Sequence, residues 1–170
     1  MEVILTAVTA VAALSAAAFA AYQIYLSRLS LSVKLLLNLE ERFDGPALQK
    51  QRSAAVNAIR SNTPDNESNV EDVLDFFETI GLLTHRKALD KEMVWNSFFY
   101  WLHGYWRFCR PFIDKQRKTY PARYAELIWL HGKLLAIEEK KYGLLDENEW
   151  NGFLDKEGDT AIEHPCEGTM

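Results

Sequence analysis

The chain has 170 residues, 48% of them hydrophobic, and a formal net charge of −5. Its two cysteines, Cys109 and Cys166, are too few and too far apart for a disulfide framework or a zinc motif. The charge is uneven: residues 142–170 carry eight acids and one lysine, a net −7, which leaves +2 on residues 1–141. An acidic chain with a sequence pI of about 5.4 and no recognised nucleic-acid module disfavours nucleic acid as a partner.

The N-terminal segment is apolar and uncharged from Val3 to Ser27, a run of 25 residues. A helix of this length covers about 37 Å, and a bilayer's hydrocarbon core is about 30 Å thick. The only charged side chain before the run is acidic, Glu2, whereas a secretory signal begins with Lys or Arg. Basic residues follow the run at Arg28, Lys34 and Arg42. This pattern predicts that residues 1–28 are an uncleaved single-span anchor with the N-terminus outside and the body in the cytoplasm, at the bacterial inner membrane.

The composition of this segment leaves a second interpretation open. It contains nine alanines, and Ala16, Ala18 and Ala20 resemble the end of a cleaved export signal. The same alanines form two small-residue faces, which would let two spans approach closely and form a homo-oligomer. These faces consist of Ala12, Ala16 and Ala20, and of Ala13, Ala17 and Ala21.

The rest of the chain is expected to be helical, because no segment shows the two-residue alternation of a strand. The first helix continues through a juxtamembrane part, residues 29–43, and breaks at Asp44-Gly45-Pro46. A cytoplasmic helical domain, residues 44–141, follows. Its helices are predicted at 46–60, 68–84, 91–110 and 121–141, with Asp90 capping the third of them and Pro111 ending or kinking it. The predicted fold class is all-α, a small helical bundle behind a single transmembrane helix.

Residues 142–170 are predicted to be an acidic, largely flexible tail. Trp150, Phe153 and Leu154 are its only strong apolar residues. They are expected to dock briefly at most. Removing residues 156–170 should therefore leave the melting temperature unchanged.

Two helical faces define the expected core. In the helix at 68–84 the apolar residues fall on one face that includes Gly81, whose missing side chain would let a neighbouring helix come close. The helix at 91–110 has a wider, aromatic face, interpreted as core rather than as a base-stacking or membrane-docking surface. That face comprises Val94, Trp95, Phe98, Phe99, Trp101, Leu102, Tyr105 and Trp106.

Several segments occur in an order that resembles a bacterial family catalogued as domain of unknown function 4760. They are an N-terminal span, "QKQRSAAV", "VLDFFETIGLL", "VWNSFFYWLHGYW" and "FIDKQRK". The resemblance covers about residues 5–140. It implies a small membrane-tethered helical protein and supplies no activity or cofactor.

No catalytic, cofactor or metal residues are predicted. The chain has no glycine-rich phosphate loop, H-E-x-x-H, C-x-x-C or nucleophile-elbow motif. His131 lies on an apolar helix face and is expected to be a hydrogen-bonded core residue, whereas His103 is expected to be solvated.

Arg52, Glu78 and His131 are polar residues on or beside apolar faces, and they form a candidate polar core cluster. A buried charge needs a partner, so an Arg52–Glu78 ion pair is expected, with His131 as a third member. Two uses stay open for this cluster: a clamp between helices, or a polar pocket for a small ligand.

A basic segment at residues 107–123 is a candidate lipid- or partner-facing patch. A solvated face, and contact with the acidic tail, are the alternatives. Its residues are Arg107, Arg110, Lys115, Arg117, Lys118 and Arg123. The sequence as a whole favours a membrane-anchored adaptor or regulatory module with a protein partner, and not an enzyme. The alternative function is a small-molecule or lipid sensor that uses Arg52, Glu78 and His131.

Overall fold

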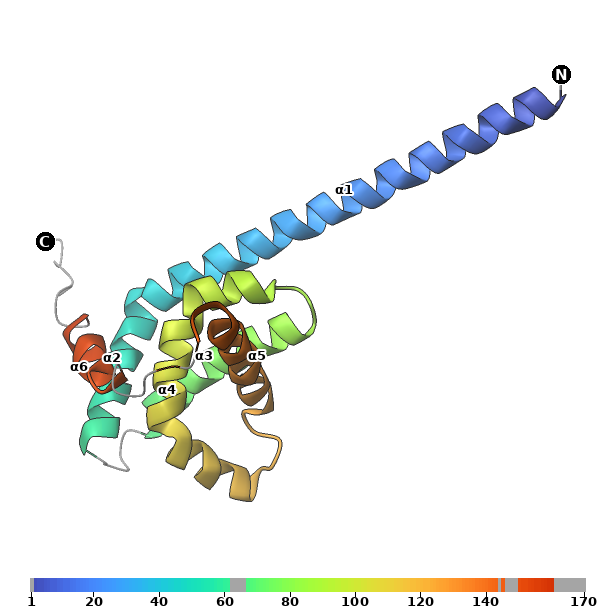
Figure 1. Cartoon of the computed structure of the whole chain (residues 1–170). Helices are drawn as coiled ribbons and strands as arrows, with labels where there is room; N and C mark the ends of the chain where they lie inside the picture. The colour runs from blue at the N-terminus through green and yellow to red at the C-terminus, as the bar shows by residue number, and fades with distance from the viewer. Residues whose placement is uncertain (1, 62–66, 144, 146–149, 161–170) are drawn as a thin grey trace, which may run out of the picture.

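The computed structural model is all-helical in the residues that it describes (Figure 1). It describes the backbone of residues 2–61, 67–143, 145 and 150–160, and the side chains of 14–61, 68–143, 145 and 150–158. The helices are α1 (Glu2–Asp44), α2 (Pro46–Ser61), α3 (Glu67–His85), α4 (Lys91–Thr119), α5 (Ala125–Tyr142) and α6 (Phe153–Thr160). The all-α prediction is confirmed, and so is the break between α1 and α2 at Gly45.

α1 is one continuous helix that projects far beyond the body of the molecule (Figure 1). Residues 14–31 are all exposed, and Ser32 is the first α1 residue that the body buries. From there on, Leu36, Leu39 and Phe43 enter the core at helical spacing. The described side chains of α1 therefore anchor it to the body through its last three turns.

Among the described residues, no helix is both long and apolar enough to cross a membrane. The side chains of residues 2–13, which form much of the predicted span, lie outside the described residues. The anchor at residues 1–28 therefore stays a prediction.

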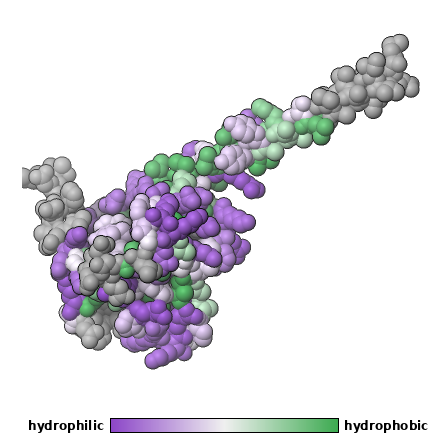
Figure 2. All heavy atoms as spheres, in the orientation of Figure 1, coloured by the Kyte–Doolittle hydropathy of each residue, from purple (hydrophilic) through white to green (hydrophobic). Residues whose placement is uncertain are grey.

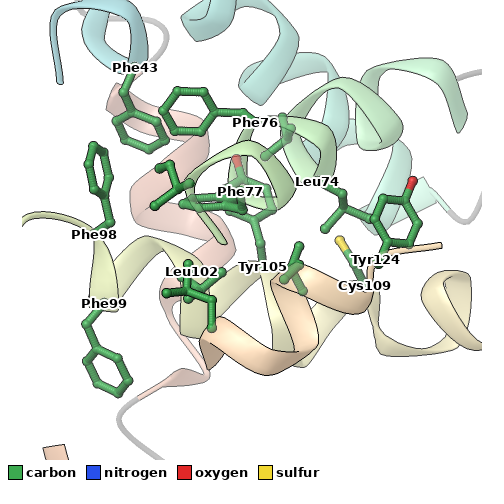
Figure 3. Close-up of a cluster of buried hydrophobic side chains, with 14 of the residues drawn as sticks. Phe43, Leu74, Phe76, Phe77, Phe98, Phe99, Leu102, Tyr105, Cys109 and Tyr124 are labelled. Atoms are coloured by element: carbon green, nitrogen blue, oxygen red, sulfur yellow. The ribbon is translucent and has the colours of Figure 1, made fainter. Parts of the chain in front are cut away.

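The body is built around α3, which packs against α2, α4 and α5. Its apolar face is completely buried at Val73, Leu74, Phe77 and Ile80, as its periodicity predicts. Figure 3 shows Leu74 and Phe77 of this face among side chains from α1 and α4. Phe43 of α1 lies against the rings of Phe76, Phe77 and Phe98, with centroids 5.4–6.0 Å apart. The core is thus closed by aromatic rings from α1, α3 and α4.

α4 confirms the core interpretation of the aromatic segment. Phe98, Phe99, Leu102 and Tyr105 are buried, and the three tryptophans Trp95, Trp101 and Trp106 are partly buried against the core. The predicted cap is also confirmed, because the Asp90 carboxylate accepts hydrogen bonds from the backbone N–H groups of Glu92 and Met93.

The predicted end of this helix near Arg110 is wrong. α4 continues through Pro111 to Thr119. Pro111 lacks an N–H and so gives up one helical hydrogen bond. Cys109 and Ile113, four residues apart on one face, are both buried on either side of it. Burial of that face offsets the lost bond.

The tail prediction is wrong for the described part of residues 142–170. α6 packs on the body, with Trp150, Phe153 and Glu157 buried. These three residues recur at intervals of three and four, so one face of this short segment docks. Residues 161–170, which include His164 and Cys166, lie outside the described residues.

The expected close approach at Gly81 is confirmed, and it yields a test with a matched control. A Cβ on Gly81 would lie 2.5 Å from the backbone carbonyl oxygen of Glu126 in α5, whereas a Cβ on Gly132 would meet nothing within 4 Å. We expect Gly81→Ala to lower the free energy of unfolding by about 1–3 kcal/mol, because backbone must move. Gly132→Ala should raise it by up to about 1 kcal/mol. Denaturant unfolding in detergent measures both, and equal effects would contradict the close contact.

Candidate functional site

A buried ion pair joins Arg52 of α2 to Glu157 of α6. The Arg52 Nε donates to Glu157 Oε1 at 2.6 Å, and its Nη2 donates to Oε2 at 2.9 Å. The two side chains are 6% and 0% exposed. The Tyr105 hydroxyl donates to the same Glu157 Oε1 at 2.7 Å. A bidentate pair with a third hydrogen bond satisfies both charges away from water.

Aromatic rings cover the faces of the Arg52 guanidinium. Its central carbon lies 3.8 Å from the ring centroid of Phe43 and 4.8 Å from that of Trp101. Its Nη1 donates to the Phe43 carbonyl oxygen at 3.1 Å. Residues from α1, α2, α4 and α6 therefore meet at one guanidinium.

Burial and the charge of Glu157 determine the pKa shifts of Arg52 and Tyr105. Burial alone would lower the pKa of Arg52, but the hydrogen bond and charge of Glu157 raise it above its usual value. Burial, then the charge of Glu157, raise the pKa of Tyr105 well above its usual value. Both groups thus stay protonated. The arrangement ties α1, α2, α4 and α6 together.

Glu78 has a different role from the one expected. Its carboxylate accepts hydrogen bonds from the backbone N–H groups of Leu127 at 2.6 Å and Glu126 at 3.3 Å. These groups belong to the first turn of α5, where unpaired N–H groups favour an anion. Burial raises the pKa of Glu78, against the effect of these two bonds. The predicted Arg52–Glu78 ion pair is therefore wrong: each residue has separate partners.

His131 is a core residue, as expected, but its partner is His103. The Nε2 of His131 and the Nδ1 of His103 are 3.1 Å apart. The imidazole of His131 stacks on Trp106, with centroids 4.6 Å apart and planes 19° apart. Burial, then the nearby His103 and Arg110, lower the pKa of His131 to about 3. The expectation of a solvated His103 is wrong, because it bonds across to α5.

The candidate polar core cluster therefore divides into three separate sites. Arg52 meets α6, Glu78 caps α5 and His131 pairs with α4. Sequence reasoning missed Glu157 because it lies among acids in a segment with little apolar character. The available signal was its spacing of four residues from Phe153 on one helix face. Within the described residues, no group of three or more His, Cys, Asp or Glu side chains is arranged to hold a metal ion.

The basic segment at residues 107–123 lies at the end of α4 and the turn that follows. Arg110 pairs with Asp114 at 3.2 Å, and Arg123 with Glu71 at 3.4 Å. Arg107 and Lys115 also have interactions within the molecule. Arg117 is half-buried and Lys118 is exposed. Much of the positive charge is therefore engaged by the protein itself.

The direction of α4 places the basic segment away from the projecting part of α1. Asp90 contacts Ser32, and Ser97 contacts Glu40, so α4 starts out in the same direction as α1. The end of α4 accordingly lies at the side of the body opposite to the projection (Figure 1).

A family model described as Domain of unknown function (DUF4760) matches residues 7–134. The chain belongs to the DUF4760 family. No curated protein and no solved structure matches the chain. The resemblance predicted over residues 5–140 is confirmed, with slightly narrower bounds. Arg52 and Tyr105 lie inside the DUF4760 match, while α6 with Glu157 lies beyond it.

Breaking the Arg52–Glu157 ion pair should strongly destabilise the body. We expect Glu157→Ala to lower the free energy of unfolding by about 3–5 kcal/mol, because it leaves Arg52 charged and buried. Glu157→Gln should be milder, since its amide oxygen still accepts a hydrogen bond. Removing residues 156–170 should now destabilise the protein as much as Glu157→Ala. Denaturant unfolding in detergent measures all three.

A neighbouring pair provides the control. Arg60 and Asp155 join the same two helices, but their side chains are 41% and 76% exposed. Asp155→Ala should therefore change stability by less than about 1 kcal/mol. The double change Arg52→Leu with Glu157→Leu should be more stable than either leucine variant alone. Additive losses, or equal losses at Asp155 and Glu157, would contradict the role given to the buried pair.

The depressed pKa of His131 predicts a loss of stability in mild acid. Its pKa is about 3 in the folded protein against an ordinary value of 6.5, so the unfolded chain binds more protons between these values. The free energy of unfolding should therefore fall as the pH drops below 6.5, by up to about 2 kcal/mol at pH 5. His131→Gln should flatten this part of the profile. Unfolding curves recorded from pH 7.5 to 5 measure this dependence. If the free energy of unfolding falls equally with pH in the unsubstituted protein and in His131→Gln, His131 is excluded as the cause.

Proposed function

We propose that this DUF4760 protein is a single-span membrane-anchored interaction module whose helical body faces the cytoplasm of a bacterial cell. The observation that supports it is the projecting part of α1, where residues 14–31 are all exposed. Large apolar side chains lie along it (Figure 2). They include Leu14, Phe19, Tyr22, Ile24, Tyr25, Leu26, Leu29 and Leu31. A helix that exposes many large apolar side chains and leaves its own domain needs another apolar surrounding, such as lipid.

The aromatic residues on α1 support a membrane boundary near its middle. Tyr22 and Tyr25 are 56% and 61% exposed and lie six and three residues before Arg28. Tyrosine followed by a basic residue is typical of the interface between hydrocarbon and headgroups. Glu2 before the apolar run and Arg28 after it favour an orientation with the body in the cytoplasm.

An adaptor or regulatory role is supported by how the body uses its polar groups. Arg52, Glu78 and His131 each stabilise a contact between helices, so they do not form the common pocket that a sensor would use. The basic segment at residues 107–123 lies away from the proposed membrane. It is better placed for an acidic protein partner than for lipid.

Self-association in the membrane is also part of this proposal. Ala16 and Ala20, and likewise Ala17 and Ala21, are exposed on α1. Small residues four apart allow close packing of helices in lipid.

The topology can be measured directly. A reporter fused to the C-terminus should be active in the cytoplasm, and the chain should stay in the membrane pellet after carbonate extraction. Reversing the charge bias with Glu2→Lys, Arg28→Glu and Lys34→Glu should shift a fraction of the molecules to the opposite orientation. A reporter active only in the periplasm, or release by carbonate, would contradict the proposal.

A further inference from the structure

The turn between α3 and α4, residues 86–90, is the part of the body nearest to the projecting half of α1. Ser32 is the first buried residue of α1, and the backbone N–H of Asp90 donates to its hydroxyl at 3.3 Å. Figure 1 shows the turn on the side of the body from which α1 projects. A membrane or a protein that surrounds the projecting part of α1 would therefore contact the body at this turn.

We propose that this turn is a lipid-docking surface, which holds the body against the anionic headgroups of the membrane. Its cationic side chains are Arg86 and Lys87, and Lys91 follows at the start of α4; all three are exposed. Within the described residues, none of them forms an ion pair. Two exposed acids lie beside them, Asp90, whose carboxylate caps α4, and Glu92, so three cations and two acids leave this surface with a net charge of +1.

The depth of the turn matches the headgroup layer. This step rests on the proposed membrane anchor, with Arg28 at the edge of the hydrocarbon. Ser32 is four residues beyond Arg28, which is about 6 Å along the helix axis. The polar layer on each side of a bilayer is about 5–8 Å thick. The turn at Ser32 then lies at the level of the phosphates.

The backbone of the turn is also held by hydrogen bonds, so docking would cost little conformational entropy. Ala88 N–H donates to the Leu83 carbonyl at 2.9 Å, and Lys87 N–H donates to that of Thr84 at 3.0 Å. Lys87 has the left-handed backbone (φ 60°) that ends many helices, and Leu89 is buried in the core. Arg86 and Lys87 are thus presented by a fixed backbone.

The end of α5 extends the same surface. Lys141 Nζ lies 3.7 Å from the ring centroid of Trp95, which is one turn into α4. Tyr142 also stacks on Trp95, with ring centroids 6.1 Å apart, and is 73% exposed. An exposed tyrosine beside lysines is suited to the headgroup layer. The surface therefore combines cationic groups with an amphipathic ring.

The experiment uses the full chain, reconstituted in liposomes of neutral lipid or of neutral lipid with a quarter of anionic phosphatidylglycerol. A fluorophore is attached at Lys87→Cys in a Cys166→Ser background, where the buried Cys109 does not react. A headgroup-attached quencher in the bilayer reports proximity. A second label at Lys118→Cys, at the far end of α4, is the positional control.

We expect strong quenching at position 87 in anionic liposomes and little at position 118. Each cationic group at an anionic surface strengthens docking about fivefold, so Arg86→Gln with Lys91→Gln should shift the docked-to-undocked ratio by about 25-fold. The matched pair Arg117→Gln with Lys118→Gln should leave quenching at position 87 unchanged. High salt should weaken the docking.

The outcomes separate this inference from the proposed anchor. If the chain floats with the liposomes and resists carbonate, but positions 87 and 118 are quenched equally, the docking surface is wrong and the anchor stands. A chain that does not associate with liposomes at all overturns both. Equal effects of the two glutamine pairs would mean that general charge, and not this turn, attracts the body.

Discussion

The buried charge of Arg52 is the constraint on which the arrangement of the body depends. A guanidinium away from water requires a carboxylate, and the structure brings that carboxylate from the other end of the chain, at Glu157. Meeting this requirement fixes α6 on α2 and places Tyr105 beside them. Phe43 and Trp101 then cover the faces of the guanidinium. One ion pair thereby joins α1, α2, α4 and α6.

The other polar groups of the interior follow the same logic on a smaller scale. Glu78 supplies the acceptor that the first turn of α5 lacks, and Gly81 lets that turn approach α3 closely. His131 stays neutral between His103 and Trp106. Each group removes the cost of burying a polar atom at a contact between helices. The polar residues of the interior therefore stabilise the packing of the helices. For this reason the proposed function is assigned to the surface of the body and not to its interior.

The shape of the molecule separates two surfaces that the sequence does not distinguish. Both the α3–α4 turn and the segment at residues 107–123 are basic. Because α4 starts out in the same direction as α1, its first turn lies beside Ser32 and its end lies across the body. A protein held by α1 would present the first surface to lipid and the second to a soluble partner. This division would give the proposed membrane-tethered module two different contacts.

The sequence by itself determined the helices from α1 to α5, apart from the end of α4, and most of the core. Periodicity located the buried faces of α3 and α4, and the tripeptide at Asp44 located the break after α1, because these signals act within a few turns of one helix. The tertiary structure alone decided the partners of Arg52, Glu78 and His131. Residues 105 positions apart, as Arg52 and Glu157 are, carry no local sign that they meet. A helix face shows that a charge is buried, but the packing of other helices selects the partner, so the apparently flexible acidic segment proved to hold the essential carboxylate.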